Sequence, residues 1–223
     1  MLNDIIQLLK RDNLMVQALD ECYEMVDICS SMLDACVESL RRRDDASIEL
    51  DVHKLDKKLN AFERDVRRKV MTHLAVGGKQ DLTSGLVLVS IVIDLERIGD
   101  YAKNIYDLVI AHPTRLVAGS IEPQLAEVEA LAMGNFHRAV HVFKTSDVEA
   151  AKELMADYKS EISSACRAIE EALIAGEADL SASEAVVVAL YVRFLKRISS
   201  HARNLVSSIT NPFPRIGYKV KDS

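Results

Sequence analysis

Residues that interrupt helices are scarce in this sequence, which has eight glycines and four prolines among 223 residues and also lacks tryptophan. Because glycine and proline disfavour a helix interior, their scarcity within long stretches of helical periodicity predicts an all-α fold. No apolar stretch reaches the roughly 20 residues that a membrane-spanning helix needs. The longest one, Leu86 to Ile93, contains a serine and ends at Asp94. The N-terminal stretch also lacks the cleavage site of a secretory signal, so we expect a soluble, cytoplasmic protein.

An excess of positive charge is absent as well. The net charge is −6 at pH 7 and the isoelectric point is about 5.6. Proteins that bind nucleic acid hold the phosphate backbone with clustered lysine and arginine. We therefore expect no nucleic-acid partner.

The cysteines form no redox or metal-binding motif, because no Cys-x-x-Cys pair occurs. Cys22, Cys29 and Cys36 are seven residues apart, too far along one helix to form disulfides with each other. Leucines and valines interleave with them in an a/d seam, so we expect reduced thiols in a helical core.

One stretch of the chain occurs twice, a hundred residues apart. The two copies read Asp94-Leu-Glu-Arg-Ile-Gly-Asp-Tyr-Ala-Lys-Asn104 and Phe194-Leu-Lys-Arg-Ile-Ser-Ser-His-Ala-Arg-Asn204. A repeat of this length indicates two similar domains rather than a solenoid, whose periods are about 20–50 residues. We therefore predict one domain at residues 1–112 and a second at residues 113–223.

Apolar periodicity and helix breakers divide each domain into three helices. The prediction is two tandem three-helix bundles with six long antiparallel helices, near residues 3–43, 48–77, 81–111, 122–144, 146–175 and 181–210. Residues 113–123 are predicted to be the linker. The tail from Phe213 either docks on a bundle or a partner, or folds back and caps the last helix.

The first copy of the repeat places oxygen-bearing side chains on one helix face. Glu96, Asp100 and Asn104 are each four residues apart, so they form a column along the helix, which we name the acidic column. An apolar stripe runs roughly opposite, so we expect the column to face outward, where a cation or a partner can reach it. In the second copy, Lys196 and Ser200 replace the two acids.

The string Leu-Glu-Arg-Ile-Gly-Asp, repeated in degenerate form near the C-terminus, resembles the signature of the PhoU family of phosphate-uptake regulators. The resemblance extends to Asp56-Lys-Lys-Leu-Asn60 in the second helix and to Asp157-Tyr-Lys-Ser-Glu161 in the second half. It covers nearly the whole chain and implies two tandem three-helix bundles with a cytoplasmic regulatory function rather than an enzymatic one.

The resemblance also implies partners. Such a regulator restrains a phosphate transporter and its linked sensor histidine kinase by contacting the transporter ATPase and the kinase, while some relatives are associated with sodium–phosphate symporters. Relatives are often dimeric, so a homodimer is expected, and contact with the membrane is expected only indirectly, through the transporter.

Family members carry metal ions on paired acidic motifs of adjacent helices, which implies a metal site in the first bundle. The matching residues are Glu96, Asp100, Asp56, Asn60 and Asn104. Oxygen ligands suit Mg²⁺, Ca²⁺ or Mn²⁺, and carboxylates also bind iron or zinc, so the identity of the ion stays open. The alternative is a solvated acidic face in which Asp100 pairs with Lys103.

The second bundle is expected to be metal-free or a far weaker site. The residues that correspond to the ligands of the first site are Asp157, Glu161 and Asn204. We expect Lys196 to take the place of a cation by pairing with Glu161 or Asp157.

Two other functions stay open at this point. A carboxylate-bridged metal-binding enzyme is one, although none of the six histidines follows a glutamate by three positions, as di-iron bundles require. A metal-free helical adaptor that uses the long flat sides of its bundles is the other.

Overall fold

The computed structural model describes residues 13–76, 79–157 and 161–218, and these are helical without any strand. The α-helices are α2 (Leu14–Arg42), α3 (Val52–Val76), α4 (Leu82–Ala111), α5 (Glu122–Thr145), α6 (Val148–Asp157), α7 (Glu161–Ala175) and α8 (Ala182–Thr210). Single turns of 3₁₀ helix are η1 (Lys79–Asp81), η2 (Gly119–Ile121) and η3 (Phe213–Arg215). The all-α prediction is confirmed. Among the described helices, none combines the length and the apolar character that crossing a bilayer requires.

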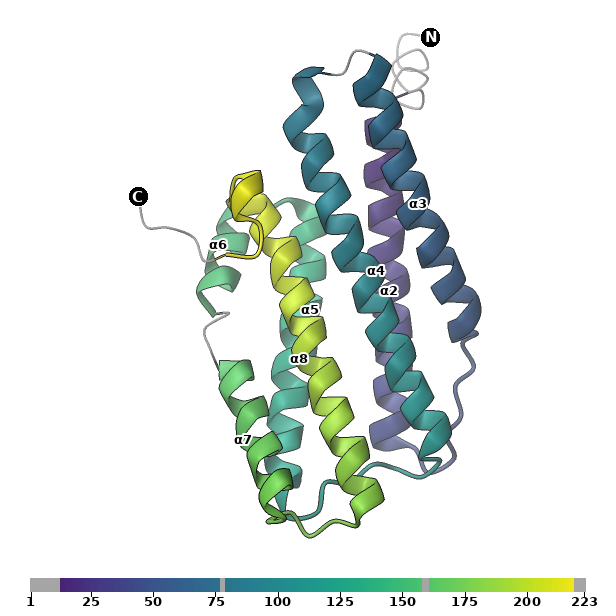
Figure 1. Cartoon of the computed structure of the whole chain (residues 1–223), viewed down its shortest axis with the longest axis vertical. Coiled ribbons are helices and arrows are strands. Elements are labelled where there is room, and N and C mark those ends of the chain that lie inside the picture. Colours follow the sequence, from purple (N-terminus) through teal and green to yellow (C-terminus); the bar gives the residue numbers. More distant parts are fainter. Residues whose placement is uncertain (1–12, 77–78, 158–160, 219–223) are drawn as a thin grey trace.

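Helices α2, α3 and α4 form the first bundle (Figure 1). Helix α2 begins at Leu14 because Asn13 Oδ1 accepts a hydrogen bond of 2.9 Å from the backbone N–H of Met15, which is a typical N-cap. The predicted start of this helix, near residue 3, lies outside the described residues.

The cysteine seam of α2 lies in the core, as predicted. Cys22, Cys29 and Cys36 are free thiols with no exposed surface. Burial raises the pKa of Cys22 and of Cys36 to about 12. Thiols with such a pKa stay protonated at neutral pH, so these cysteines serve packing rather than chemistry.

The second bundle consists of α5, α6, α7 and α8. The predicted helix at residues 146–175 corresponds to α6 and α7, and residues 158–160 between them lie outside the described part. Helix α8 begins with a capping box, in which Ser181 and Glu184 each accept a hydrogen bond from the other's backbone N–H. The prediction of two tandem bundles is confirmed, while the domain boundary between residues 112 and 113 stays a prediction.

The two bundles lie side by side, with α4 and α8 adjacent and antiparallel (Figure 1). Helices α2 and α5 also face each other but touch at far fewer points. One continuous cluster of buried apolar side chains runs through both bundles. The repeated sequence has therefore produced two bundles with a shared core.

The predicted linker packs against both bundles. Leu116 is fully buried, and its backbone N–H donates a hydrogen bond of 2.8 Å to the carbonyl of Leu40. Gly119 has a φ of +54°, and a Cβ there would lie 2.6 Å from the carbonyl oxygen of Asp179, so glycine is required at this contact.

A buried charge network joins the end of α2 to the second bundle. The Arg41 side chain is 5 % exposed and donates to Glu129 at 2.8 Å, to Glu122 at 2.5 Å and to the carbonyl of Leu116. The Tyr191 hydroxyl donates to the same Glu129 oxygen, also at 2.8 Å. Every charge in this network has a partner, which a buried ion pair needs in order to persist.

The C-terminal tail folds back onto the end of α8, one of its two predicted alternatives. The Asn211 side-chain amide donates to the carbonyls of Arg215 and Tyr218, at 3.0 and 2.8 Å. The backbone N–H of Gly217 donates to Ser207 Oγ at 2.7 Å.

Candidate functional site

A close contact between α3 and α4 sets the geometry of the acidic column. A Cβ at Gly99 would lie 2.2 Å from Leu59 Cδ1, and Leu59 is buried. The glycine of the repeated stretch is therefore a packing position. It lets α3 approach the face of α4 that carries the column.

The acidic column is half-buried, whereas the prediction was that it faces outward into solvent. The side chains of Glu96 and Asp100 are 11 % and 25 % exposed. Helix α3 packs beside this face of α4 and removes much of the column from solvent.

Lys103 lies between the acids of the two helices. Its ammonium donates to Asp56 Oδ1 of α3 at 2.8 Å and to Asp100 Oδ1 of α4 at 3.2 Å. Partial burial works to lower the pKa of Lys103, but the hydrogen bonds to Asp56 and Asp100 outweigh it and raise the pKa overall. The predicted pair of Asp100 with Lys103 is confirmed, and Asp56 takes part as well, but the face that carries the pair is half-buried rather than solvated.

Glu96 has less favourable surroundings than Asp100. Among the described residues, none donates a hydrogen bond to its buried Oε2, and the nearest cation is Arg97 Nε, at 3.4 Å. Arg97 also pairs with Asp100, at 2.9 Å. Burial raises the pKa of Glu96, and the nearby carboxylates of Asp100 and Glu63 raise it further. Glu96 is therefore the member of the column that would gain most from a further cation.

The other two predicted metal ligands are the amides Asn60 and Asn104. Asn60 donates its side-chain amide to the carbonyl of Asp56 at 3.0 Å, and Asn104 is half-buried on α4. Within the described ranges, no group of three or more histidine, cysteine, aspartate or glutamate side chains could hold a metal ion. The donor types suit a hard cation, but Lys103 already satisfies two of the carboxylates. The residues present therefore fit a metal ion poorly.

The second copy of the column is arranged differently. Lys196 Nζ lies 3.9 Å from Glu170 of α7, which is not one of its predicted partners. Ser200 donates its hydroxyl to the carbonyl of Lys196 at 2.9 Å. The side chains of Asp157 and Glu161 lie outside the described residues, so their part of the prediction has no structural outcome.

Asn204 belongs to the contact between the bundles rather than to a site in the second bundle. Its amide donates to Asp94 Oδ1 of α4 at 2.8 Å, and His201 Nδ1 lies 2.7 Å from the same oxygen. Both His201 and Asp94 are largely buried. Sequence reasoning missed this cluster. The available signal was a carboxylate, Asp94, at the end of an apolar run in one copy, where the other copy has Phe194.

The comparison with protein families shows which family the chain belongs to. The model of the PhoU domain matches residues 22–109 and again residues 125–209, which together make up most of the sequence. The chain belongs to the PhoU family. Each match covers most of one bundle, from the cysteine seam to α4 and from α5 to α8.

Relatives and solved structures agree with this assignment. The chain is 33 % identical over 122 residues to proteins from two strains of Xylella fastidiosa, each named phosphate-specific transport system accessory protein PhoU homolog. The match covers 54 % of this chain and 48–49 % of those relatives, so the chain spans about half the length of the curated relatives it matches.

Two crystal structures share the fold. PhoU from Pseudomonas aeruginosa superposes with a TM-score of 0.76 at 20 % identity and covers 88 % of this chain and 95 % of that one. The phosphate transport system regulatory protein PhoU from Streptococcus pneumoniae has a TM-score of 0.68 at 17 % identity, covering 90 % and 93 %. At these identities the likeness concerns the fold alone.

Proposed function

We propose that this chain is a cytoplasmic, non-enzymatic accessory protein of phosphate uptake, which restrains a phosphate transporter by binding its ATPase. The match of the PhoU domain to both halves of the chain carries this proposal. The names of the curated relatives, accessory proteins of a phosphate-specific transport system, support it.

Further partners follow from the same proposal. A sensor histidine kinase linked to the transporter is the second, and a phosphate symporter would replace the ATPase in a system that uses one. A second copy of the chain, giving a homodimer, is the third. Each of these contacts calls for extended helical surface, which two elongated bundles offer.

The geometry of the acidic column favours a form of this adaptor without a bound metal. Lys103 bonds Asp56 and Asp100, and so supplies the positive charge that an ion would supply at the site implied by the family resemblance. A metal ion held by Glu96, Asp100, Asp56, Asn60 and Asn104 stays a prediction. The carboxylate-bridged enzyme would need such an ion, so it is the less supported alternative.

Affinity capture tests the adaptor role. The full chain, tagged and expressed at its native level, is recovered from phosphate-replete cells, in which restraint is needed. We expect mass spectrometry to find the transporter ATPase in the recovered complex, and we expect phosphate uptake to rise when the chain is deleted. Unchanged uptake, together with no transporter or kinase component in the complex, would refute the proposal.

A further inference from the structure

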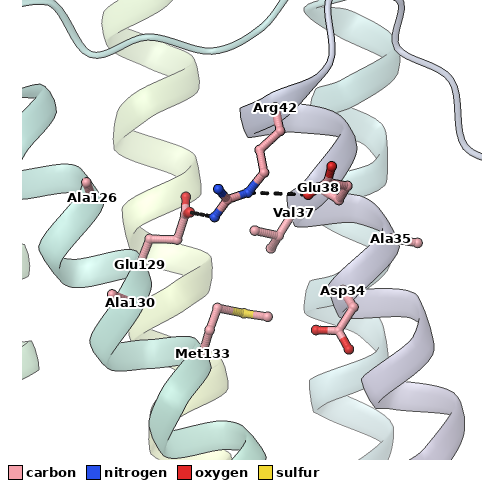
Figure 2. A pocket seen from close by; sticks show the side chains of 9 residues that line it. All are labelled: Asp34, Ala35, Val37, Glu38, Arg42, Ala126, Glu129, Ala130 and Met133. Atoms are coloured by element: carbon pink, nitrogen blue, oxygen red, sulfur yellow. Dashed lines mark ion pairs between the residues drawn. The ribbon is translucent and has the colours of Figure 1, made fainter.

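An open groove of about 600 Å³ separates α2 from α5. These helices lie behind α4 and α8 in Figure 1, so the groove is on the side of the molecule away from the main contact between the bundles. Figure 2 shows Val37 of α2 and Met133 of α5 pointing into it. Two small residues of α5, Ala126 and Ala130, line the same wall. The floor is therefore apolar, and the two alanines leave room for the backbone of another segment to approach α5.

The rim of the groove is acidic. Asp34 and Glu38, one turn apart on α2, both have half-exposed carboxylates. Among the described residues that line the groove, Arg42 is the only lysine or arginine, and it reaches Glu38 at 3.3 Å and Glu129 at 3.7 Å (Figure 2). Glu129 is already neutralised from below by the buried Arg41. The charge presented to solvent is thus negative, over an apolar floor.

The openness of the groove suits a helix lying over it rather than a small molecule. The Arg42–Glu129 contact crosses one end, and His137 bonds Asp34 at 3.1 Å at the other. Asp34 and Arg42 are eight residues apart, which is about 12 Å, or roughly two helical turns. Much of the lining is exposed, whereas a small ligand typically has about 70–90 % of its surface buried.

We propose that this groove binds a helical segment of a partner protein, with apolar side chains on one face and lysine or arginine flanking them. The apolar side chains lie against Val37 and Met133, and the basic ones reach Asp34 and Glu38. This is the helix-in-groove mode of recognition, and the charges at the rim speed association and select against acidic segments. The inference rests on the proposed adaptor function, which supplies the partner.

A synthetic peptide provides the probe. It is a fluorescent helical peptide of about 14 residues, roughly four turns, built from leucine, alanine and lysine with the leucines on one face. The control peptide carries glutamate in place of lysine. We expect the lysine peptide to bind the full chain in fluorescence anisotropy and the glutamate peptide not to bind. Added salt should weaken the binding, because the pairs at the rim are exposed.

Three variants connect this binding to the groove. Ala130→Tyr places a large side chain in the groove from an exposed position. It should weaken binding by about tenfold or more, because the leucines of the peptide then lose their contact with the apolar floor. Asp34→Asn combined with Glu38→Gln should weaken binding by about fivefold. Gln124→Tyr places the same aromatic ring at an exposed position of α5 outside the groove and should leave binding unchanged. Circular dichroism establishes that each variant is folded.

Equal binding of the two peptides, or full binding by Ala130→Tyr, overturns the proposal. Loss of a dimer in Ala130→Tyr without binding of the lysine peptide also overturns it, because a second copy of the chain would then be the occupant. If Ala130→Tyr captures the ATPase as well as the wild type does, the groove is not the binding site for the partner, but the adaptor function still holds. If the peptide binds but no transporter or kinase component is captured from cells, the adaptor function is refuted and the groove remains a binding site for a helix.

Discussion

The two copies of the repeated stretch agree where they pack and differ where they carry charge. Leu95 and Leu195, Ile98 and Ile198, and Ala102 and Ala202 are all buried at equivalent positions of α4 and α8. In α4 the charged positions are Glu96 and Asp100, neutralised by Lys103 and Arg97 of the same helix. In α8 the corresponding charge is the cation Lys196, which faces Glu170 of α7. The repeat therefore fixes the packing, while each bundle balances its charges in its own way.

A shared residue can also have different roles in the two bundles. Arg97 stays within the first bundle and pairs with Asp100. Arg197 donates instead to the Tyr101 hydroxyl at 3.2 Å, across the contact between the bundles. The same letter in a repeat thus does not establish the same contact. Substitutions at the charged and packing positions of the two bundles separate these roles.

The largest effect is expected at the network that joins the bundles. Arg41→Met removes the main cation of the buried Glu129 and leaves it only the more distant Arg42, so we expect a loss of about 3–5 kcal/mol in the free energy of unfolding. Urea denaturation measures it. The neighbouring Arg42, 63 % exposed, gives the matched control Arg42→Met, which should cost less than about 1 kcal/mol. Equal losses for the two variants would show that the buried network stabilises the fold no more than the exposed pair does.

A smaller effect is expected where the two copies differ by one packing residue. Gly99→Val forces a side chain into the space of Leu59 Cδ1, and we expect a loss of about 1–3 kcal/mol from overpacking. The second copy has the buried Ser199 at this position, so α8 tolerates a Cβ there. Ser199→Ala should therefore be close to neutral. Thermal unfolding compares the two, and a stable Gly99→Val would mean that α3 and α4 do not meet at this glycine.

The smallest effect is expected at Glu96, and it depends on pH. The folded state raises the pKa of this carboxyl above its ordinary value of 4.5 through burial and neighbouring acids, so it favours the protonated form. The contribution of Glu96 to stability is thus fully present below the unfolded-state pKa and is lost as the pH rises through the raised folded-state pKa.

The isosteric variant Glu96→Gln should accordingly match the wild type near pH 4. At pH 7 it should exceed the wild type by about 0.2–0.5 kcal/mol, the cost of a like-charge pair one turn apart. Urea denaturation at a series of pH values measures the difference. A variant that is less stable than the wild type at pH 7 would mean that the contact of Glu96 with Arg97 outweighs the repulsion from Asp100 and Glu63.

Helix periodicity predicted the helices because each helix buries a stripe that a local pattern records. The seam of Cys22, Cys29 and Cys36 and the twin stretches in α4 and α8 are examples. The half-burial of the acidic column could not be predicted in this way. It depends on how closely α3 approaches Gly99, and one helix read alone does not show the distance to its neighbour.

The contact between the bundles could not be predicted from the sequence for the same reason. Asp94 meets His201 and Asn204 more than a hundred residues away along the chain, and no periodicity connects them. Lys103 was an intermediate case. Its spacing from Asp100 predicted that pair correctly, whereas its second partner, Asp56, lies on another helix and emerges only from the packing.

The first bundle carries its own cation, Lys103, at the acidic column. Isothermal titration with Mn²⁺ and Mg²⁺ tests this most directly on the wild type, Lys103→Met and Lys196→Met. We expect no binding by the wild type or by Lys196→Met. Lys103→Met should take up an ion, and adding Glu96→Gln should abolish that uptake. Stoichiometric binding by the wild type that disappears in Asp56→Asn or Asp100→Asn would contradict the claim.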